Sequence, residues 1–278
     1  MTTKRALSVG FAALLLLTIS FISCKKDAKP GDADIEASEN NSLAESNYND
    51  VNTMVDLAVT NGTSMTFKGD DISGILSGCV TVTLDTVSSP RTVTIDFGAN
   101  NCLCIDGRNR RGKILASYTG KYKDAGTVVN ITFDNYFVND NQIKGTHKTT
   151  NMGNNNAGHL VYKVEVNGQI VKANNKGTIS WISTREREWV AGANTINPLD
   201  DEYSITGTAS GTNADEQAYT IAITQPLVRK MSCRWFESGK LDVTPEGKST
   251  RTLDYGSSGC DASATVTISG ITFNVVLP

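Results

Sequence analysis

The chain alternates between apolar and polar residues over many short stretches from about residue 63 onward. The clearest runs are Val80–Asp85, Thr92–Phe97 and Tyr162–Val166. A period of two residues is typical of half-buried antiparallel strands, and Thr, Val and Ile suit the pleated surface of such strands. We count roughly a dozen strands with no helical pattern between them, which argues against parallel βαβ units. The sequence therefore predicts an all-β fold, in which a large antiparallel sheet forms either a sandwich or a curled, partly open barrel.

Turn-forming residues separate these runs. Asn167-Gly168 lies between two alternating stretches and predicts a two-residue type I′ hairpin. Further turn clusters occur at Asn139-Asp140, Asn174–Gly177 and Pro245–Gly247. Frequent turns of this kind agree with an antiparallel sheet.

The N-terminus has the layout of a secretory signal. Residues 1–23 contain a short basic region followed by an apolar stretch from Ala6 to Ile22. This stretch runs into Phe21-Ile22-Ser23-Cys24, which resembles the lipobox of bacterial lipoproteins, with Phe where Leu is usual. The resemblance implies cleavage before Cys24, a lipid on the Cys24 side chain and an acylated amino terminus, which together anchor a protein stably to a membrane. An ordinary secretory signal followed by a chance cysteine is the alternative.

The residues after Cys24 bear on where such a lipoprotein would go. Lys26 and Asp27 partly resemble a surface-export signal of Gram-negative lipoproteins, whereas Ala28 departs from it. By resemblance to the known sorting rule, Lys25 disfavours retention in the inner membrane. We therefore expect a cell-envelope, outer-membrane lipoprotein that faces either the periplasm or the cell surface.

Three segments follow from these patterns. Residues 1–23 form the cleaved signal peptide, residues 24–42 a polar, flexible tether, and residues 43–278 the β domain. One short amphipathic helix is expected from about Leu43 to Ala58, because apolar residues recur there at helical spacings. It should end before Asn61-Gly62.

An internal repeat, at about 79–104 and 233–261, organises four of the six cysteines. Thr92–Cys102 (TVTIDFGANNC) aligns with Thr250–Cys260 (TRTLDYGSSGC). Each segment follows another strand and another cysteine, and a glycine in each allows the chain to turn sharply back. The alternative is a coincidental likeness between strands in a Thr-rich protein.

The repeat predicts two disulfides, Cys79–Cys102 and Cys233–Cys260, which export to the cell envelope would permit. Cys104 is then left over, and its pairing with Cys79 in place of Cys102 is the main alternative. Cys102-Leu-Cys104 could also be half of a soft-metal site, but neither His147 nor His159 has a ligand-spaced neighbour. We expect a disulfide and a spare thiol there, and no metal.

The run ISWISTREREW places two tryptophans and two arginines on one face of a strand. These residues are Trp181, Arg185, Arg187 and Trp189. Arg beside Trp can bind anionic or sugar ligands through stacking and forked hydrogen bonds, so this is a candidate ligand-binding face. The alternative is a cross-strand ladder, with each Arg paired to an acidic neighbour and the Trp side chains buried.

A second basic cluster consists of Arg108, Arg110, Arg111 and Lys113. It could bind an anion, although we favour a solvated turn as its interpretation.

Composition narrows the function further. The chain has 26 Lys and Arg against 29 Asp and Glu, a balance that argues against a nucleic-acid partner. The motifs G-x-S-x-G, H-E-x-x-H and G-x-G-x-x-G are missing from the sequence, which weakly favours a non-enzyme without a cofactor. We therefore expect a binding or structural module, lipid-anchored to the membrane through Cys24, with a protein or glycan partner in the cell envelope. The alternatives are a carrier of a lipid or other hydrophobic ligand in the curled sheet, and a carboxylate-based hydrolase.

Overall fold

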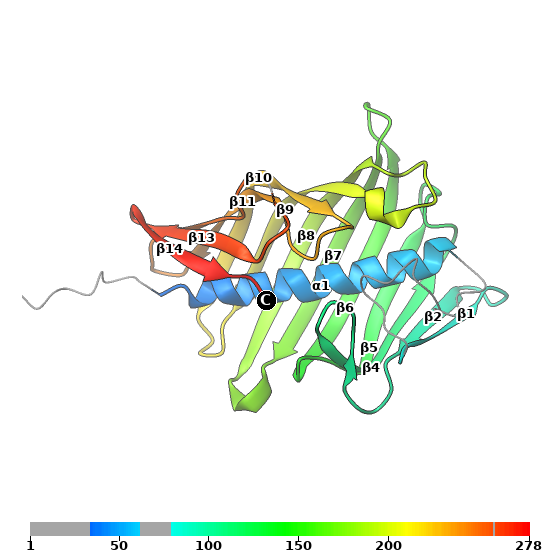
Figure 1. The fold of residues 1–278 in the computed structure, drawn as a ribbon, viewed down its shortest axis with the longest axis horizontal. Coiled ribbons are helices and arrows are strands. Elements are labelled where there is room, and N and C mark those ends of the chain that lie inside the picture. Colours follow the sequence, from blue (N-terminus) through cyan, green and yellow to red (C-terminus); the bar gives the residue numbers. More distant parts are fainter. Residues whose placement is uncertain (1–33, 62–78, 258) are drawn as a thin grey trace, which may run out of the picture. The chain divides into compact units, whose positions relative to one another are not determined.

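The computed structural model describes residues 34–61, 79–257 and 259–278. Within these residues the fold consists of an α-helix and a single sheet of 14 strands (Figure 1). The helix is α1 (Glu36–Asn61). The strands are β1 (Thr81–Asp85), β2 (Arg91–Asp96), β3 (Cys102–Leu103), β4 (Asn109–Tyr118), β5 (Val128–Val138), β6 (Asn141–Asn154), β7 (Leu160–Val171), β8 (Thr178–Ala191), β9 (Glu202–Thr212), β10 (Ala218–Lys230), β11 (Ser238–Pro245), β12 (Arg251–Asp254), β13 (Ser263–Ile268) and β14 (Ile271–Val276). Two short 3-10 helices are η1 (Ala173–Asn175) and η2 (Pro198–Asp200).

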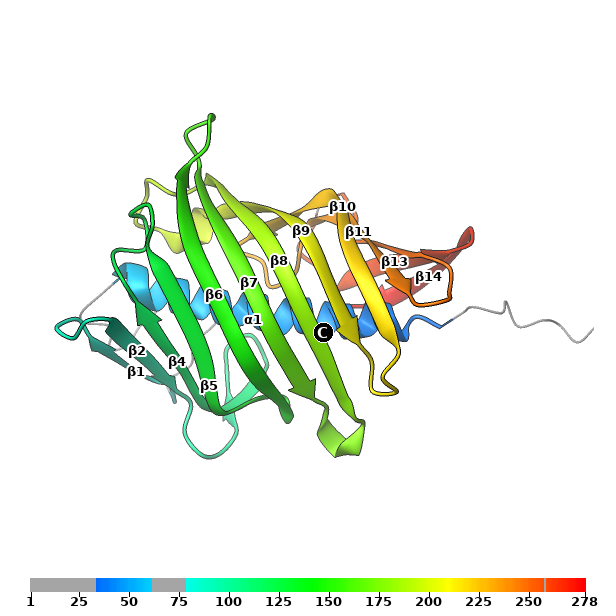
Figure 2. The same ribbon diagram turned by 180° about the vertical axis from the view of Figure 1, so that it is seen from behind.

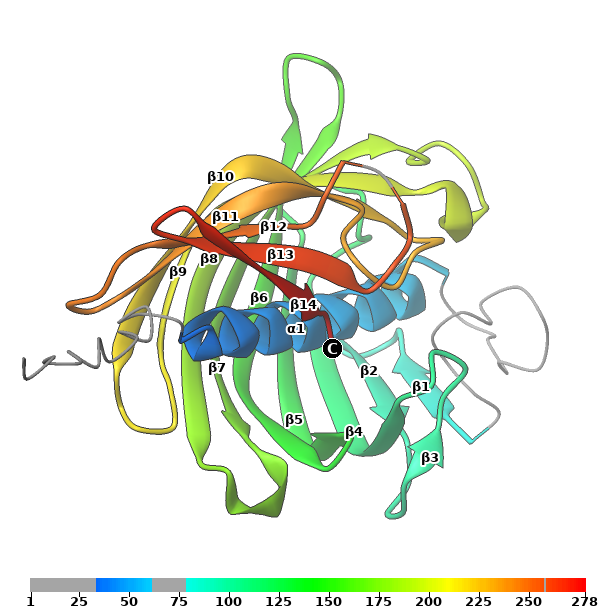
Figure 3. The same ribbon diagram turned by 60° about the vertical axis from the view of Figure 1, so that its left-hand side comes forward.

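The strands follow one another across the sheet in chain order. The order is β1-β2-β4-β5-β6-β7-β8-β9-β10-β11-β12-β13-β14, and β3 pairs with β4 beside this path. Neighbouring strands are antiparallel throughout, β1 and β14 form the two edges, and the open sheet curls around α1 (Figure 3). The predicted all-β class with a curled, partly open sheet is confirmed, and the strands do not divide into the two layers of a sandwich.

The helix α1 lies along the concave face of the sheet. Figure 2 shows the opposite, convex face, with α1 behind the strands, and β13 and β14 fold over the N-terminal half of α1 in Figures 1 and 3. The helix runs from Glu36 to Asn61, so it extends beyond the predicted range of about Leu43 to Ala58 at both ends, and residues 36–42 of the predicted tether are helical. Of these residues, Ser38, Asn40, Asn41 and Ser42 are buried, whereas residues 24–33 of the predicted tether lie outside the described residues. No helix among the described residues is long and apolar enough to cross a membrane.

The burial of α1 is unusual for a polar helix. Among its described side chains, only Glu39 and Thr60 are exposed. Ten polar side chains are buried, and they are Ser38, Asn40, Asn41, Ser42, Glu45, Asn47, Asp50, Asn52, Thr53 and Asp56. A helix that is enclosed on all sides is normally apolar. Since Asn is a modest helix former and isolated helices are marginal, contacts with the sheet must stabilise α1.

One predicted turn is wrong. Asn167-Gly168 lies inside β7, paired with β6 on one side and β8 on the other. A Cβ atom on Gly168 would lie 2.0 Å from the hydroxyl oxygen of Tyr48 on α1. That hydroxyl donates to the carbonyl oxygen of Lys144 at 2.8 Å. The glycine therefore marks a close approach of the helix to the sheet, a second role of glycine in strands. The other three predicted turns join consecutive strands.

The repeated unit forms a hairpin toward each edge of the sheet. One hairpin consists of β1 and β2, the other of β11 and β12. The predicted disulfides Cys79–Cys102 and Cys233–Cys260 are both formed, so the alternative pairing of Cys104 with Cys79 does not occur. Each disulfide joins the segment just before its hairpin to the segment just after it.

The two hairpins also share the geometry of the turn that follows them. Asp96 accepts a hydrogen bond from the backbone N–H of Gly98 at 2.8 Å, and Asp254 accepts one from Gly256 at 2.9 Å. Both glycines have a positive φ, of 80° and 89°, which favours glycine over other residues. Each aspartate also pairs with a lysine on the neighbouring strand nearer the sheet centre, at 3.0 and 2.9 Å. The sequence repeat therefore corresponds to a structural repeat.

Candidate functional site

The predicted ligand-binding face lies on the concave side of β8, directly under α1. Trp181, Arg185, Arg187 and Trp189 are between 2% and 5% exposed. The helix therefore covers this face. The arrangement agrees with the ladder interpretation in that Arg pairs with acidic residues and Trp is buried. Its acidic partners, however, come from α1 and not from a neighbouring strand.

The first half of this face holds the N-terminal part of α1. The indole N–H of Trp181 donates to Asn41 at 3.0 Å. Arg185 donates from Nε and Nη2 to the carboxylate of Glu45, at 3.2 and 2.6 Å. A planar guanidinium suits this forked geometry, which fixes the rotation of the helix as well as its distance from the sheet.

The second half holds the C-terminal part of α1. Arg187 donates from Nη1 to Asp56 at 2.5 Å, and its guanidinium carbon lies 3.6 Å from the ring centre of Tyr203. Beside it, the indole N–H of Trp189 donates to Asp201 at 3.2 Å. Each of the four predicted residues is thus engaged by the protein itself.

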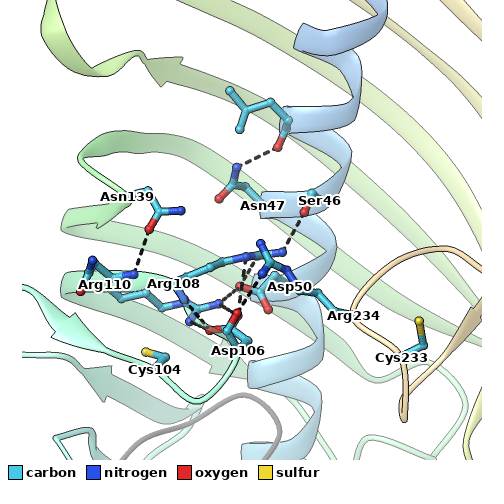
Figure 4. Close-up of polar contacts among 12 residues, drawn as sticks. Ser46, Asn47, Asp50, Cys104, Asp106, Arg108, Arg110, Asn139, Cys233 and Arg234 are labelled. Carbon is cyan, nitrogen blue, oxygen red and sulfur yellow. Dashed lines mark hydrogen bonds and ion pairs between the residues drawn. The ribbon is translucent and has the colours of Figure 1, made fainter. Parts of the chain in front are cut away.

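The second basic cluster is not a solvated turn. Arg108 and Arg110 are 4% and 0% exposed, and they converge on two aspartates (Figure 4). Nη2 of Arg110 lies 2.5 Å from Asp50 and 2.6 Å from Asp106, while Nη1 of Arg108 lies 3.1 Å from Asp50. Burial alone would raise the pKa of the Asp50 carboxyl, but Arg110 and Arg108 hold that pKa below its usual value. The other two members form ion pairs nearer the surface, Arg111 with Asp140 and Lys113 with Asp96.

Beside this cluster lies a cavity of about 300 Å³, which we call the arginine cavity. Its walls come from the middle of α1, the turn between β3 and β4, the segment between β10 and β11, and the residues after β14. The lining residues are Ser42, Ser46, Asn49, Asp50, Asp106, Arg108, Leu199, Arg229, Met231, Ser232, Cys233, Arg234, Trp235, Phe236, Tyr255, Cys260, Leu277 and Pro278. Both cysteines of the Cys233–Cys260 disulfide belong to the wall.

Two further arginines line the arginine cavity. Arg229 is 6% exposed and donates to the backbone carbonyl oxygens of Cys233 and Trp235. Arg234 donates to the backbone carbonyl oxygen of Asp106 at 2.8 Å. Among the described residues, no carboxylate forms an ion pair with either guanidinium. These two cations therefore contact neutral acceptors.

Electrostatics confirm that positive charge is crowded here. Burial, with the nearby charges of Arg108 and Arg234, lowers the pKa of Arg229 to about 10, although Asp50 acts in the opposite direction. Burial and Arg108 likewise lower the pKa of Arg234. Burial is the larger cause for both groups, and the neighbouring arginines add to it.

A second cavity, of about 210 Å³, lies at the C-terminal end of α1, and we call it the tyrosine cavity. The charged and aromatic residues that line it are Asp56, Tyr122, Lys123, Arg187, Trp189, Asp201 and Tyr203. Burial raises the pKa of Asp56 to about 6, against the effect of Arg187. Burial also raises the pKa of Asp201 to about 6. Two carboxyls that titrate near neutral pH thus share one cavity.

The remaining sequence candidates have structural surroundings. Cys102 is part of a disulfide, and the buried Cys104 thiol donates to the Cys102 carbonyl oxygen at 3.6 Å. His147 is buried beside α1 with Nε2 at 2.9 Å from Asn52, and burial lowers its pKa to about 3. The described residues contain no group of three or more His, Cys, Asp or Glu side chains placed to hold a metal ion.

Apart from Arg108, which belongs to the predicted basic cluster, sequence reasoning missed the charged residues that build the arginine cavity. Asp50 lies 60 positions before its partner Arg110, and no local motif joins them. One signal could have indicated the arrangement. The segment that forms α1 contains five Asp and Glu residues and no Lys or Arg, so its buried acids need cations from elsewhere in the chain.

Comparisons of the chain with protein-family models, with curated proteins and with solved structures give no match in any of the three. Function must therefore be argued from the cavities themselves.

Proposed function

We propose that this protein is a lipid-anchored binding module of the cell envelope, and that the arginine cavity holds its ligand. One observation carries the proposal. Arg229, which is buried, and Arg234, which is half-buried, form no ion pair with a carboxylate among the described residues, and both line a cavity large enough for a small molecule. Buried charge without a partner is costly, so a protein retains it where a ligand makes use of it.

The proposal places the ligand away from the face formed by Trp181, Arg185, Arg187 and Trp189. Trp181, Arg185 and Arg187 bind α1, and Trp189 donates to Asp201. Among the described residues, the hydrogen bonds of Arg229 and Arg234 go to backbone carbonyl oxygens. A hydrophobic carrier would need the concave face of the sheet for its cargo, and α1 occupies that face.

Ligand binding is tested with a small-molecule library of mixed charge, screened by ligand-observed NMR against the mature protein. Ser232 lines the arginine cavity and its side chain is exposed, so Ser232→Trp should obstruct the mouth without disturbing the core. We expect bound compounds of some kind, and we expect Ser232→Trp to abolish their binding. If no compound binds, or if Ser232→Trp leaves every bound compound in place, the cavity is not a ligand site.

Anchoring is tested by Cys24→Ser. The wild-type protein should incorporate labelled palmitate and sediment with outer membranes, and the variant should do neither. If the variant still sediments with the membrane, a lipid on Cys24 is not what attaches the protein, and the lipid anchor is rejected.

A carboxylate-based hydrolase is the second candidate, and it is favoured by the tyrosine cavity. A carboxyl with a pKa near 6 is suited to general acid or base catalysis at neutral pH. A panel of chromogenic glycosides and esters tests this candidate. Turnover that is lost in Asp201→Asn supports it, and a lack of turnover across the panel rejects it.

A further inference from the structure

The side chains around the arginine cavity carry more positive than negative charge. The arginines are Arg108, Arg110, Arg229 and Arg234, and the carboxylates that they contact or approach belong to Asp50 and Asp106. Four cations against two anions leave two positive charges without a side-chain counterion. Arg108, Arg110 and Arg229 are each 6% exposed or less, so they belong to a buried framework, and Arg234 is half-buried at the cavity wall.

The hydrogen-bonding groups without partners at the cavity also favour an anion, because three of them are donors. Nε of Arg229, Nε of Arg234 and the indole N–H of Trp235 are buried, and none has a hydrogen-bond partner among the described residues. All three groups are donors and cannot accept. These donors and the guanidinium charges beside them favour a ligand with negative charge, and an oxyanion can accept several hydrogen bonds at once.

Much of the remaining wall is apolar, although Ser42, Ser46, Asn49 and Ser232 also line it. Met231, Phe236 and Leu277 line the cavity with Trp235, and the ring of Phe236 packs edge-on against Tyr255 with centroids 5.2 Å apart. A bare inorganic ion would leave this surface unused. A ligand with an apolar group beside its anionic group would cover it, at roughly 25 cal/mol per Å² of apolar area.

We infer that the arginine cavity binds a small oxyanion that bears an apolar group, such as a phosphate monoester of a ring or short chain. Arg229 and Arg234 recognise the negative charge, and Trp235 and Phe236 contact the apolar group. This inference rests on the proposed function, because it names the ligand class of the same cavity.

The same chemistry occurs in two sources. A free phosphate monoester and the headgroup of an anionic lipid both present a phosphate beside an apolar portion. The enclosed volume of about 300 Å³ suits the free ester, and the experiment below separates the two.

The test uses the mature protein and isothermal titration calorimetry with three probes. Phenyl phosphate has both required parts, inorganic phosphate lacks the apolar part, and benzyl alcohol lacks the charge. We expect phenyl phosphate to bind at least about tenfold more tightly than either of the others, because inorganic phosphate lacks the apolar contact and benzyl alcohol lacks the charge-assisted hydrogen bonds. Vesicles of phosphatidylglycerol, compared with vesicles of phosphatidylcholine, form the lipid arm. Capture by the former with no response to phenyl phosphate assigns the site to a lipid headgroup.

Arg234→Gln is the primary variant. Arg234 makes a hydrogen bond to one backbone carbonyl, whereas Arg229 holds two and its replacement is more disruptive to the fold. Arg234→Gln should weaken binding of phenyl phosphate about tenfold and leave benzyl alcohol unchanged. The matched control is Lys230→Gln, because Lys230 is a neighbouring cation that pairs with Glu237 at 2.8 Å outside the cavity. The control should bind phenyl phosphate as the wild type does.

Two results would overturn the inference. In the first, neutral or cationic compounds bind in the Ser232→Trp-sensitive site as tightly as anions do. In the second, Arg234→Gln and Lys230→Gln weaken phenyl phosphate equally. Either result would still allow the cavity to be a ligand site and would reject only the assignment of its ligand as an oxyanion with an apolar group. If no compound of any charge binds, the proposed function itself fails.

Discussion

Arg185 of β8 and Glu45 of α1 form a forked ion pair, with Nε and Nη2 at 3.2 and 2.6 Å from the two carboxylate oxygens. Both side chains are about 5% exposed. The pair is one of several polar contacts that hold a polar helix inside a curled sheet. In this protein, hydrogen bonds and ion pairs take a place that apolar contacts occupy in most buried helices.

Removal of one partner of this pair should destabilise the protein strongly. Glu45→Ala leaves Arg185 buried and uncompensated, and we expect a loss of about 3–5 kcal/mol in the free energy of unfolding. Urea denaturation measures the loss. The exposed pair Lys240–Asp254 provides the control, since Lys240→Met should cost less than about 1 kcal/mol. Equal losses for the two variants would contradict the structural role of the buried pair.

Replacement of both partners tests whether the ion pair stabilises the protein more than an apolar pair of similar volume would. Glu45→Leu combined with Arg185→Met should recover most of the loss, because an apolar pair of similar volume removes two buried charges together. If the double variant remains as unstable as Glu45→Ala, the pair is worth more than its apolar substitute.

Gly168→Ala should displace α1 from the sheet. The new Cβ would meet the Tyr48 hydroxyl at 2.0 Å and its ring carbon at 2.2 Å, so the helix or β7 must move. We expect a loss of about 1–3 kcal/mol, the usual cost of overpacking. Gln169→Ala is the matched control, because Gln169 is the next residue on β7 and its side chain is exposed. A Gly168→Ala protein as stable as this control would disprove the close approach.

Asp201 and Asp56 should make stability fall as the pH rises from about 4 to 6, against the smaller opposing contribution of buried His147, whose lowered pKa makes stability rise with pH. Burial raises the pKa of Asp201 from 3.8 to about 6, so between these values the folded protein holds a proton that the unfolded chain has released. The stabilising effect is complete below pH 3.8 and is lost as the pH passes 6, and Asp56 acts in the same direction. Asp201→Asn should make the slope of unfolding free energy against pH shallower, by up to about 1.4 kcal/mol per pH unit. The exposed Asp215→Asn should keep the wild-type slope.

The two disulfides should differ in what their removal does to binding. Each closes a loop of similar length, with sequence separations of 23 and 27, so each double Cys→Ala variant should lose on the order of 3 kcal/mol. Only Cys233 and Cys260 line the arginine cavity. The Cys233→Ala, Cys260→Ala variant should therefore lose affinity for phenyl phosphate. The Cys79→Ala, Cys102→Ala variant should retain it, and a loss in both would show that binding depends only on overall stability.

The strands and the disulfides could be predicted because their signals are local or repeated. Alternation along Thr92–Phe97 reports which side chains face the interior, and the inward residues of β2 are indeed buried. The cysteine pairing followed from two copies of one hairpin unit, which a single copy would not have specified. Signals of this kind can be read from the sequence without knowing which distant residues come into contact.

The rest of the fold could not be predicted because it depends on partners far apart in sequence. The segment 36–42 has no apolar stripe, so its helix exists only because the sheet surrounds it. Arg108 and Arg110 read as a solvated turn because nothing beside them in sequence shows that Asp50 would cover them. Asn167-Gly168 has the composition of a turn, but here the small side chain makes room for Tyr48. In each case a tertiary contact overrides a local preference.

The position of α1 at the start of the chain determines the order in which this domain can assemble. Tyr48 and Asn41 find their partners 96 and 140 positions later in the chain, so these partners are synthesised long after the helix segment. Until β4 and β8 are in place, the acids of the segment have no cations to pair with, and the segment has no reason to stay helical. Helix formation is then a late event, and the concave face must stay accessible until it occurs. Such distant contacts make slow folding the expectation, and they leave a polar, protease-sensitive leader exposed for as long as the sheet is incomplete.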